Sequence, residues 1–415
     1  MIPRPRKSTL PTLLSAQPAN GYTIPTAMIP VLFLTLFSQA AIVLASLALP
    51  VIAPAAAADI GISASAIGYF SSLVYLGAVT SSLLTIGFIN RYGGIRMLQA
   101  SLALAAFGVT FVATGQIVLI VAGAILIGLS YGPANPTSSR LLVRFVPKDL
   151  QNFYFSVKQT SVPVAGTLAG FVLPVLTALA GWRIAVLTCA LACVGLVVVA
   201  GIWRKNLDTD CDPTASLSAA IGVRAIALVL RQPRLRRVAL SSVAFASLQF
   251  VFTSFFVAIV TERAGLSLVT AGAALSSAMA ISAGTRLFWG WIADKFSGGS
   301  VLAILGVSMG GLFFVLYFVD SAWPVPLIFV LSVSIGVTAV SWNGIFLAEI
   351  ARVAPPDKIT DATAGSMFFM FVGGILAPAA FSLLARLTGD FLVGFIVITV
   401  LAIIGGISVL KRDTA

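Results

Sequence analysis

The sequence predicts an all-α membrane protein with twelve transmembrane helices, arranged as two similar bundles of six. Two observations on composition and two on pattern lead to this fold class. Hydrophobic residues make up 59% of the 415-residue chain and charged residues only 9%, whereas soluble domains carry about 25% charged residues. The apolar residues fall in twelve runs, each long enough to cross roughly 30 Å of hydrocarbon as a helix. The last six runs repeat several residue types of the first six.

The twelve runs lie, in order, at residues 28–52, 63–89, 95–114, 116–143, 152–180, 183–203, 237–261, 268–292, 300–319, 324–351, 360–386 and 391–410. The first run is too long for the apolar region of a signal peptide, so we interpret residues 1–27 as a flexible cytosolic arm. Residues 28–203 are then an N-terminal six-helix bundle and 237–410 a C-terminal one, with a cytosolic central loop at 204–236 and a cytosolic tail at 411–415.

The basic residues predict the orientation of the chain. If the arm is cytosolic, 20 of the 25 Lys and Arg lie on the cytosolic side, and only Arg183, Arg263 and Arg386 on the other. Positive residues accumulate in the cytosolic loops of membrane proteins, so we expect both termini in the cytosol and a multi-pass protein of the cell inner (cytoplasmic) membrane. This distribution accounts for the net charge of +12 without nucleic-acid binding, and the basic end of the central loop suits anionic lipid headgroups.

An internal repeat relates the two halves. A shift of 208 residues superimposes Gly128 on Gly336, Asn135 on Asn343, Arg144 on Arg352, Pro147 on Pro355, Asp149 on Asp357, Gly166 on Gly374 and Gly181 on Gly389. Matches at such special residue types in one register indicate two parallel six-helix repeats, related by an axis along the membrane normal.

The loops after the second and eighth runs form another repeat, Gly87-Phe-Ile-Asn90-Arg91-Tyr-Gly93 and Gly290-Trp-Ile-Ala-Asp294-Lys295. With these loops and the 6+6 layout, the chain resembles the major facilitator superfamily (MFS) of secondary transporters. The resemblance implies the MFS fold and a gating role for the loops at the cytosolic side. Asn90 departs from the acidic residue of the family. The residues expected to act in gating are Asn90, Arg91, Asp294, Lys295, Glu349 and Arg352.

Two cations lie inside predicted spans, and they shape the functional hypothesis. Lys158 is eight residues into the fifth span and Arg286 eight residues before Asp294, so each is about 12 Å from the cytosolic face at 1.5 Å per residue. A charge at this depth costs several kcal/mol and marks a substrate path by default. One cation comes from each half, which suits an anion bound between them. The alternatives are that Lys158 snorkels to the headgroups and that Arg286 pairs with Glu349 or Asp294.

The resemblance supports Arg286 as the anion ligand. Arg286-Leu-Phe-Trp-Gly290 is similar to the segment of nitrate/nitrite porters and oxalate-type antiporters in which an arginine binds the anion. The second run has Ser81 and Ser82 where nitrate porters carry a paired arginine, which favours an organic anion over nitrate. Further polar residues are expected to line the site: Gln39, Tyr131, Asn135, Gln159, Gln249, Trp342 and Asn343.

These observations predict a secondary transporter of a small organic anion, with a carboxylate as the favoured class. The rival is an efflux transporter for apolar or cationic drugs, with Phe368, Phe369, Met370 and Phe371 as a contact surface. Histidine is absent and no carboxylate lies mid-span, so antiport, uniport or symport with a substrate-borne proton fits better than a protein proton relay. We find no catalytic constellation and expect a monomer that is not an enzyme, with no cofactor and no metal.

Overall fold

The computed structural model describes residues 24–147, 151–209, 211–215, 217, 220–355 and 358–410. Most of the predicted N-terminal arm, the predicted tail and Asp149 and Asp357 of the repeat therefore lie outside the described residues. The described chain is helical, and twelve stretches are long and apolar enough to span a membrane. The predicted fold class is confirmed.

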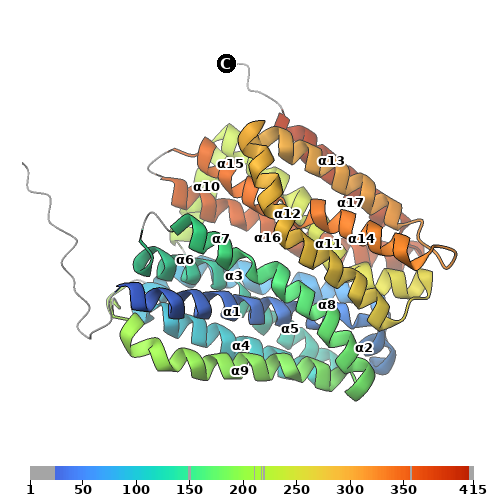
Figure 1. Ribbon diagram of the computed structural model, residues 1–415, viewed down its shortest axis with the longest axis horizontal. Helices are drawn as coiled ribbons and strands as arrows, with labels where there is room; N and C mark the ends of the chain where they lie inside the picture. The colour runs from blue at the N-terminus through green and yellow to red at the C-terminus, as the bar shows by residue number, and fades with distance from the viewer. Residues whose placement is uncertain are drawn as a thin grey trace, which may run out of the picture.

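The N-terminal half comprises α1 (Ile24–Val51), α2 (Ala53–Ile60), the 3₁₀ turn η1 (Ala64–Ala66), α3 (Ile67–Tyr92), α4 (Gly94–Ala113), α5 (Ile117–Tyr131), α6 (Ala134–Phe145), α7 (Gln151–Gln159), α8 (Ser161–Ala180) and α9 (Trp182–Leu207). The C-terminal half comprises α11 (Pro233–Ala264), α12 (Leu268–Lys295), α13 (Gly298–Leu316), α14 (Val325–Ala339), α15 (Asn343–Val353), α16 (Ile359–Thr388) and α17 (Leu392–Leu410). The two halves form separate layers in Figure 1.

Three spans consist of two helices each. The fourth span breaks between α5 and α6 at Gly132-Pro133, the fifth between α7 and α8 at Thr160, and the tenth between α14 and α15 at residues 340–342. At the fifth span, the Thr160 amide bonds to the Val157 carbonyl at 3.1 Å, a tightened turn of the 3₁₀ type. Broken helices in transporters occur where the backbone lines a binding site.

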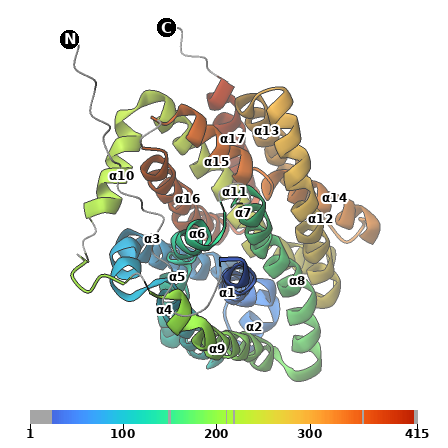
Figure 2. The ribbon, with the colours of Figure 1, turned by 60° about the vertical axis from the view of Figure 1, so that its left-hand side comes forward.

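The predicted central loop at residues 204–236 includes helical structure. It contains the helix α10 (Ala220–Arg231), which lies on α16 and also contacts α3 and α11. Ala225 and Val229 form its buried side, and a Cβ atom at Gly365 of α16 would lie 2.3 Å from the Ala225 carbonyl oxygen. An apolar stripe spaced four residues apart explains why this segment folds onto the bundle. Figure 2 shows α10 beside α16 at the edge of the molecule.

The ends of the bundle are called here the terminal face, where α1 begins and α17 ends, and the distal face, where α2 lies. The halves meet along α3–α16 and α8–α12. Hydrogen bonds join them towards the distal face: Ser71 to Ser254 at 2.8 Å, the Ala379 amide to Ser72 at 2.9 Å, and Ser382 to the Ser65 carbonyl at 2.5 Å. At the terminal face, α6 and α7 pack mainly within the N-terminal half and α15 within the C-terminal half. This conformation is closed at the distal face.

Repeated glycines allow close helix approaches within each half. A Cβ atom at Gly128 would lie 2.0 Å from the Val74 carbonyl oxygen, and one at its repeat mate Gly336 would lie 2.7 Å from the Ala278 carbonyl oxygen. These glycines join α5 to α3 and α14 to α12. Small residues drive helix association in membranes because they let backbones come into van der Waals contact.

We expect Gly128→Leu to lower the free energy of unfolding by at least about 1–3 kcal/mol, because the new side chain must push α3 and α5 apart. Thermal unfolding of the detergent-purified protein measures the effect. Gly195→Leu on α9 is the matched control, since a Cβ atom there has no heavy atom within 4 Å. Equal melting points for the two variants would show that the Gly128 contact does not limit the packing.

Candidate functional site

Arg286 is held by backbone oxygens at two of the helix breaks. Its Nη1 atom donates to the carbonyl of Gln159, the last residue of α7, at 3.3 Å, and its Nη2 atom donates to the Val340 carbonyl at 3.0 Å. Val340 lies in the break between α14 and α15. The Nε atom of Arg286 is buried and has no hydrogen-bond partner. Arg286 therefore connects the C-terminal half to the N-terminal half while keeping part of its hydrogen-bonding capacity unused.

The Gln159 carbonyl can accept the hydrogen bond from Arg286 because residue 163 is a proline. In an α-helix this carbonyl would accept a bond from the amide of the residue four positions later, which is Pro163, and proline has no amide hydrogen. A free carbonyl in hydrocarbon must find another donor, and the Arg286 guanidinium supplies it. The sequence thus creates a cation-binding oxygen at the end of α7 through one proline.

Lys158 lies one residue before this oxygen. Its side chain is only 2% exposed, and its Nζ atom donates to Asn135 Oδ1 of α6 at 2.5 Å. The ammonium therefore points into the protein, towards the break in the fourth span, and not out to the headgroups as snorkelling would require. An ammonium group has three donors, and this contact uses one of them.

Neither cation has a carboxylate partner among the described residues. Glu349, one of the two partners that the sequence suggested for Arg286, instead accepts two hydrogen bonds from Arg352, from Nε at 2.9 Å and from Nη2. The side chain of Asp294, the other suggested partner, lies outside the described part of the chain. The charges at residues 158 and 286 are thus met by neutral oxygens. Burying an uncompensated charge costs several kcal/mol, so the arrangement favours an anion that completes it.

The remaining polar candidates separate into two groups. Gln249, Trp342 and Asn343 lie together in the C-terminal half, where Gln249 Oε1 accepts from Trp342 Nε1 at 2.9 Å and from Asn343 Nδ2 at 3.1 Å. Trp342 is fully buried. These contacts satisfy an interhelical network, so the repeat mates Asn135 and Asn343 have different partners. In the other half, Gln39 on α1 is buried, and its Oε1 atom has no donor.

The sequence analysis missed Tyr75 and Phe250, which form an aromatic cluster with Tyr131 and Phe371. Tyr75 of α3 stacks on Phe250 of α11 with ring centroids 4.0 Å apart, and Tyr131 and Phe371 lie 6.1 Å and 6.3 Å from Tyr75. The repeated glycine Gly374 was the one sequence signal of this cluster. In the structure, a Cβ atom at Gly374 would lie 2.6 Å from the Tyr75 ring. The cluster joins four helices from both halves.

The predicted gating residues lie in separate clusters. Asn90 accepts a hydrogen bond from Arg140 through its side chain and one from the Asp212 amide, at 2.9 Å, through its carbonyl. Lys295 lies over the Trp291 ring at 3.8 Å, and Arg91 over the Tyr92 ring at 5.7 Å. Together with the Glu349–Arg352 pair, these contacts stay within one half or its adjoining segment.

Comparisons with known proteins agree on the fold. The family model of the Major Facilitator Superfamily matches residues 31–378. Among solved structures, the nucleoside transporter NupG has a TM-score of 0.76 at 12% identity, with 92% of this chain and 100% of that chain covered. A POT family transporter in complex with 5-aminolevulinic acid has a TM-score of 0.74 at 14% identity, with 91% and 94% covered.

A bacterial homolog of the human lysosomal transporter Spinster, in an inward-facing and unoccupied conformation, has a TM-score of 0.70 at 12% identity, with 94% of this chain and 99% of that chain covered. At these identities the likeness extends to the fold alone. No curated protein matches this chain in sequence.

We expect Lys158→Met to raise the stability of the protein without ligand by about 1–4 kcal/mol, because it replaces an uncompensated buried charge with an apolar side chain of similar length. Thermal unfolding measures the change. Lys205→Met on the exposed end of α9 is the control and should leave the melting point nearly unchanged. A lower melting point for Lys158→Met would mean that the Asn135 contact outweighs the cost of desolvation.

Proposed function

Because the chain belongs to the major facilitator superfamily, we propose that this membrane transporter carries a small organic anion, recognised through a carboxylate, by alternating access of its two halves. The site consists of Arg286 and Lys158 with Gln159, Asn135 and Tyr131 around them. The positive-inside distribution of the loops supports a cytosolic terminal face, which makes the present conformation an inward-facing one. We propose further that the protein acts as a monomer in the cytoplasmic membrane.

The observation that carries this proposal is a pair of deep cations that no carboxylate of the described residues contacts. Arg286 has five N–H donors; two are used on carbonyl oxygens and the Nε donor is unpaired. A planar guanidinium with free donors fits a carboxylate through two parallel hydrogen bonds. Lys158 adds a second positive charge next to the same backbone segment. Cationic drugs would be repelled from such a site, which counts against the multidrug alternative.

Anion binding can be coupled to movement of the halves. Arg286 belongs to the C-terminal half, whereas Lys158 and the Gln159 carbonyl belong to the N-terminal half. An anion attracted by both cations lowers their mutual repulsion and stabilises a conformation in which the halves approach at this depth. With no histidine in the chain, antiport, uniport or symport with a proton on the substrate agrees best with the available groups.

We expect Arg286→Gln to reduce carboxylate uptake into proteoliposomes by about 10- to 100-fold, the loss that corresponds to one charge-assisted hydrogen bond of 1.5–3 kcal/mol. The uptake panel contains mono-, di- and tricarboxylates, inorganic anions and nucleosides. Arg286→Lys retains the charge without the planar fork, so it should keep only part of the activity. Arg386→Gln, exposed near the distal end of α16, is the control. Unaltered carboxylate uptake by a folded Arg286→Gln protein would rule out the anion site.

Alternating access predicts that locking the distal face stops transport of any substrate. Ser71 Oγ of α3 and Ser254 Oγ of α11 lie 2.8 Å apart across the two halves, so cysteines at both positions can form a disulfide in this conformation. In a background with Cys211, the exposed natural cysteine, replaced by serine, we expect oxidation to abolish uptake and reduction to restore it. Each single-cysteine variant is a control that should be insensitive to oxidation. Full uptake by the cross-linked protein would contradict movement at this interface.

A further inference from the structure

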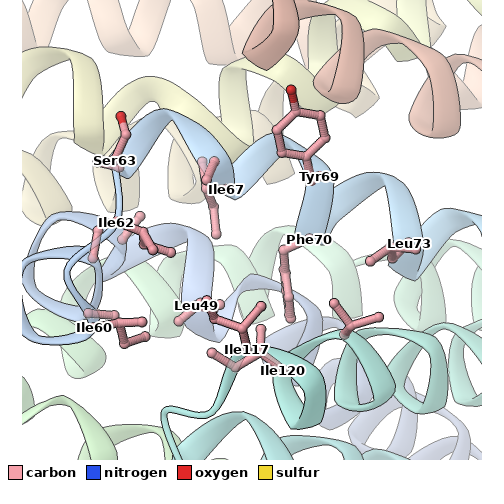
Figure 3. A pocket seen from close by; sticks show the side chains of 16 residues that line it. Leu49, Ile60, Ile62, Ser63, Ile67, Tyr69, Phe70, Leu73, Ile117 and Ile120 are labelled. Atoms are coloured by element: carbon pink, nitrogen blue, oxygen red, sulfur yellow. The ribbon is translucent and has the colours of Figure 1, made fainter. Parts of the chain in front are cut away.

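An apolar cavity lies far from the cation site, at the distal end of the N-terminal half. Its volume is about 240 Å³, and its walls come from the end of α1, from α2 and η1, and from the first turns of α3 and α5. Figure 3 shows Leu49, Phe70 and Ile120 pointing into the same space. An apolar cavity of roughly 150 Å³ in a soluble protein stays dry and binds benzene. The larger apolar cavity here therefore has room for an apolar ligand.

The cavity reaches the molecular surface between α3 and α5. Five of its lining residues are exposed: Tyr69, Ile117 and Val121 on α3 and α5, at 38%, 58% and 41%, and Ile62 and Ser63 in the segment before η1. Exposed apolar residues continue along the same helices, with Leu76 one heptad after Tyr69 and Ile125 one turn after Val121. Such stripes on membrane-spanning helices face lipid chains. The α3–α5 side of the opening is thus placed to face hydrocarbon, whereas Ile62 and Ser63 line its side at the distal loop.

A polar cluster borders the cavity at the distal face. Arg183 at the start of α9 forms an ion pair of 2.8 Å with Asp59 of α2, and Trp182 Nε1 donates to the same carboxylate oxygen at 3.2 Å. Asp59 precedes the lining residue Ile60, and Arg183 lies against Gly115, two residues before Ile117. Tryptophan and arginine at a helix end are typical of the depth at which lipid headgroups lie. Arg183 is half-exposed and can contact a phosphate.

We propose that this cavity binds one acyl chain of a phospholipid from the leaflet at the distal face, with the phosphate next to Arg183. The chain supplies the apolar contacts that the lining offers and enters directly from the bilayer between α3 and α5. An anionic transport substrate does not fit, because the lining contains no cation. The cavity is thus a second site, independent of the one at Arg286.

A bound chain also stabilises the present conformation. The lining residues Ser63 and Ala64 belong to the segment whose next residue, Ser65, accepts the hydrogen bond from Ser382 of the other half. A Cβ atom at Gly68, one residue after the lining residue Ile67, would lie 2.1 Å from the Pro378 carbonyl oxygen. The acyl chain packs behind the wall that closes the distal face. A ligand that binds one conformation preferentially shifts the population towards it.

The test titrates delipidated, detergent-purified protein with 1-palmitoyl-2-oleoyl phosphatidylethanolamine and counts bound lipid by native mass spectrometry. We expect one lipid to be retained by the wild type and binding at least 10-fold weaker in Val121→Trp, whose new ring fills the opening. Val118→Trp is the matched control on the same helix, since Val118 is 79% exposed and does not line the cavity. Wild-type binding by Val121→Trp, or equal losses in both variants, would overturn the proposal.

Three further experiments test the role of the headgroup, provide a second filled variant and test the effect on conformation. Dioleoylglycerol, which lacks the phosphate, should bind more weakly than the phospholipid, and Arg183→Gln should reduce phospholipid binding to the same level. Inorganic phosphate should compete with neither of the two lipids. Equal affinity for dioleoylglycerol and the phospholipid would overturn the role of the phosphate. Ala53→Leu fills the cavity from α1–α2 and provides a second variant if Val121→Trp does not fold. Added phospholipid should also increase disulfide formation between cysteines at positions 71 and 254 in the wild-type cavity but not in the filled one; an unchanged yield would overturn the effect on conformation.

Discussion

The hydrocarbon core of the membrane cannot solvate a charge or a free peptide group, and this constraint organises the centre of the molecule. Two cations at that depth must be solvated by the protein itself. The structure supplies oxygens where helices break: the Gln159 and Val340 carbonyls for Arg286, and the Asn135 amide oxygen for Lys158. Helix breaks and cations therefore depend on each other. Without the cations the carbonyls would lack donors, and without the breaks the charges would lack partners.

The same constraint explains how two halves with weak sequence similarity make one asymmetric site. The repeat places a glycine at equivalent positions of α8 and α16, and each accommodates a side chain of the opposite half. A Cβ atom at Gly166 would lie 2.7 Å from Met279, and one at Gly374 would lie 2.6 Å from Tyr75. The backbone plan is thus shared, whereas the inserted side chains differ. The contact of Tyr75 with Gly374 lies in the aromatic cluster that includes Tyr131, and the contact of Met279 with Gly166 lies between α8 and α12.

Much of the fold could be predicted because its signals are local. Twelve apolar runs, the bias of the basic residues and the repeated glycines are readable without coordinates, since the bilayer imposes length and polarity on each span separately. The site was only partly predictable. Residue type and depth singled out Lys158 and Arg286, but pairing is a property of three-dimensional neighbours. The Trp342–Gln249–Asn343 network and the Tyr75 cluster join residues far apart in sequence, so no spacing rule identifies these partners. For Glu349, the spacing of three residues indicated Arg352, but Arg286 was an open alternative.

The sequence by itself determined the solvent in which this protein folds, the number of its spans, their pseudo-symmetric order and the presence of two cations where water is excluded. Only the tertiary structure decided that Lys158 turns inward to Asn135, that Pro163 leaves an oxygen for Arg286, and that the halves are joined at the distal face. The physical reason is the range of the interactions. Hydrophobic matching to the bilayer acts residue by residue along the chain, whereas hydrogen bonds and close packing act over a few ångströms between segments far apart in sequence.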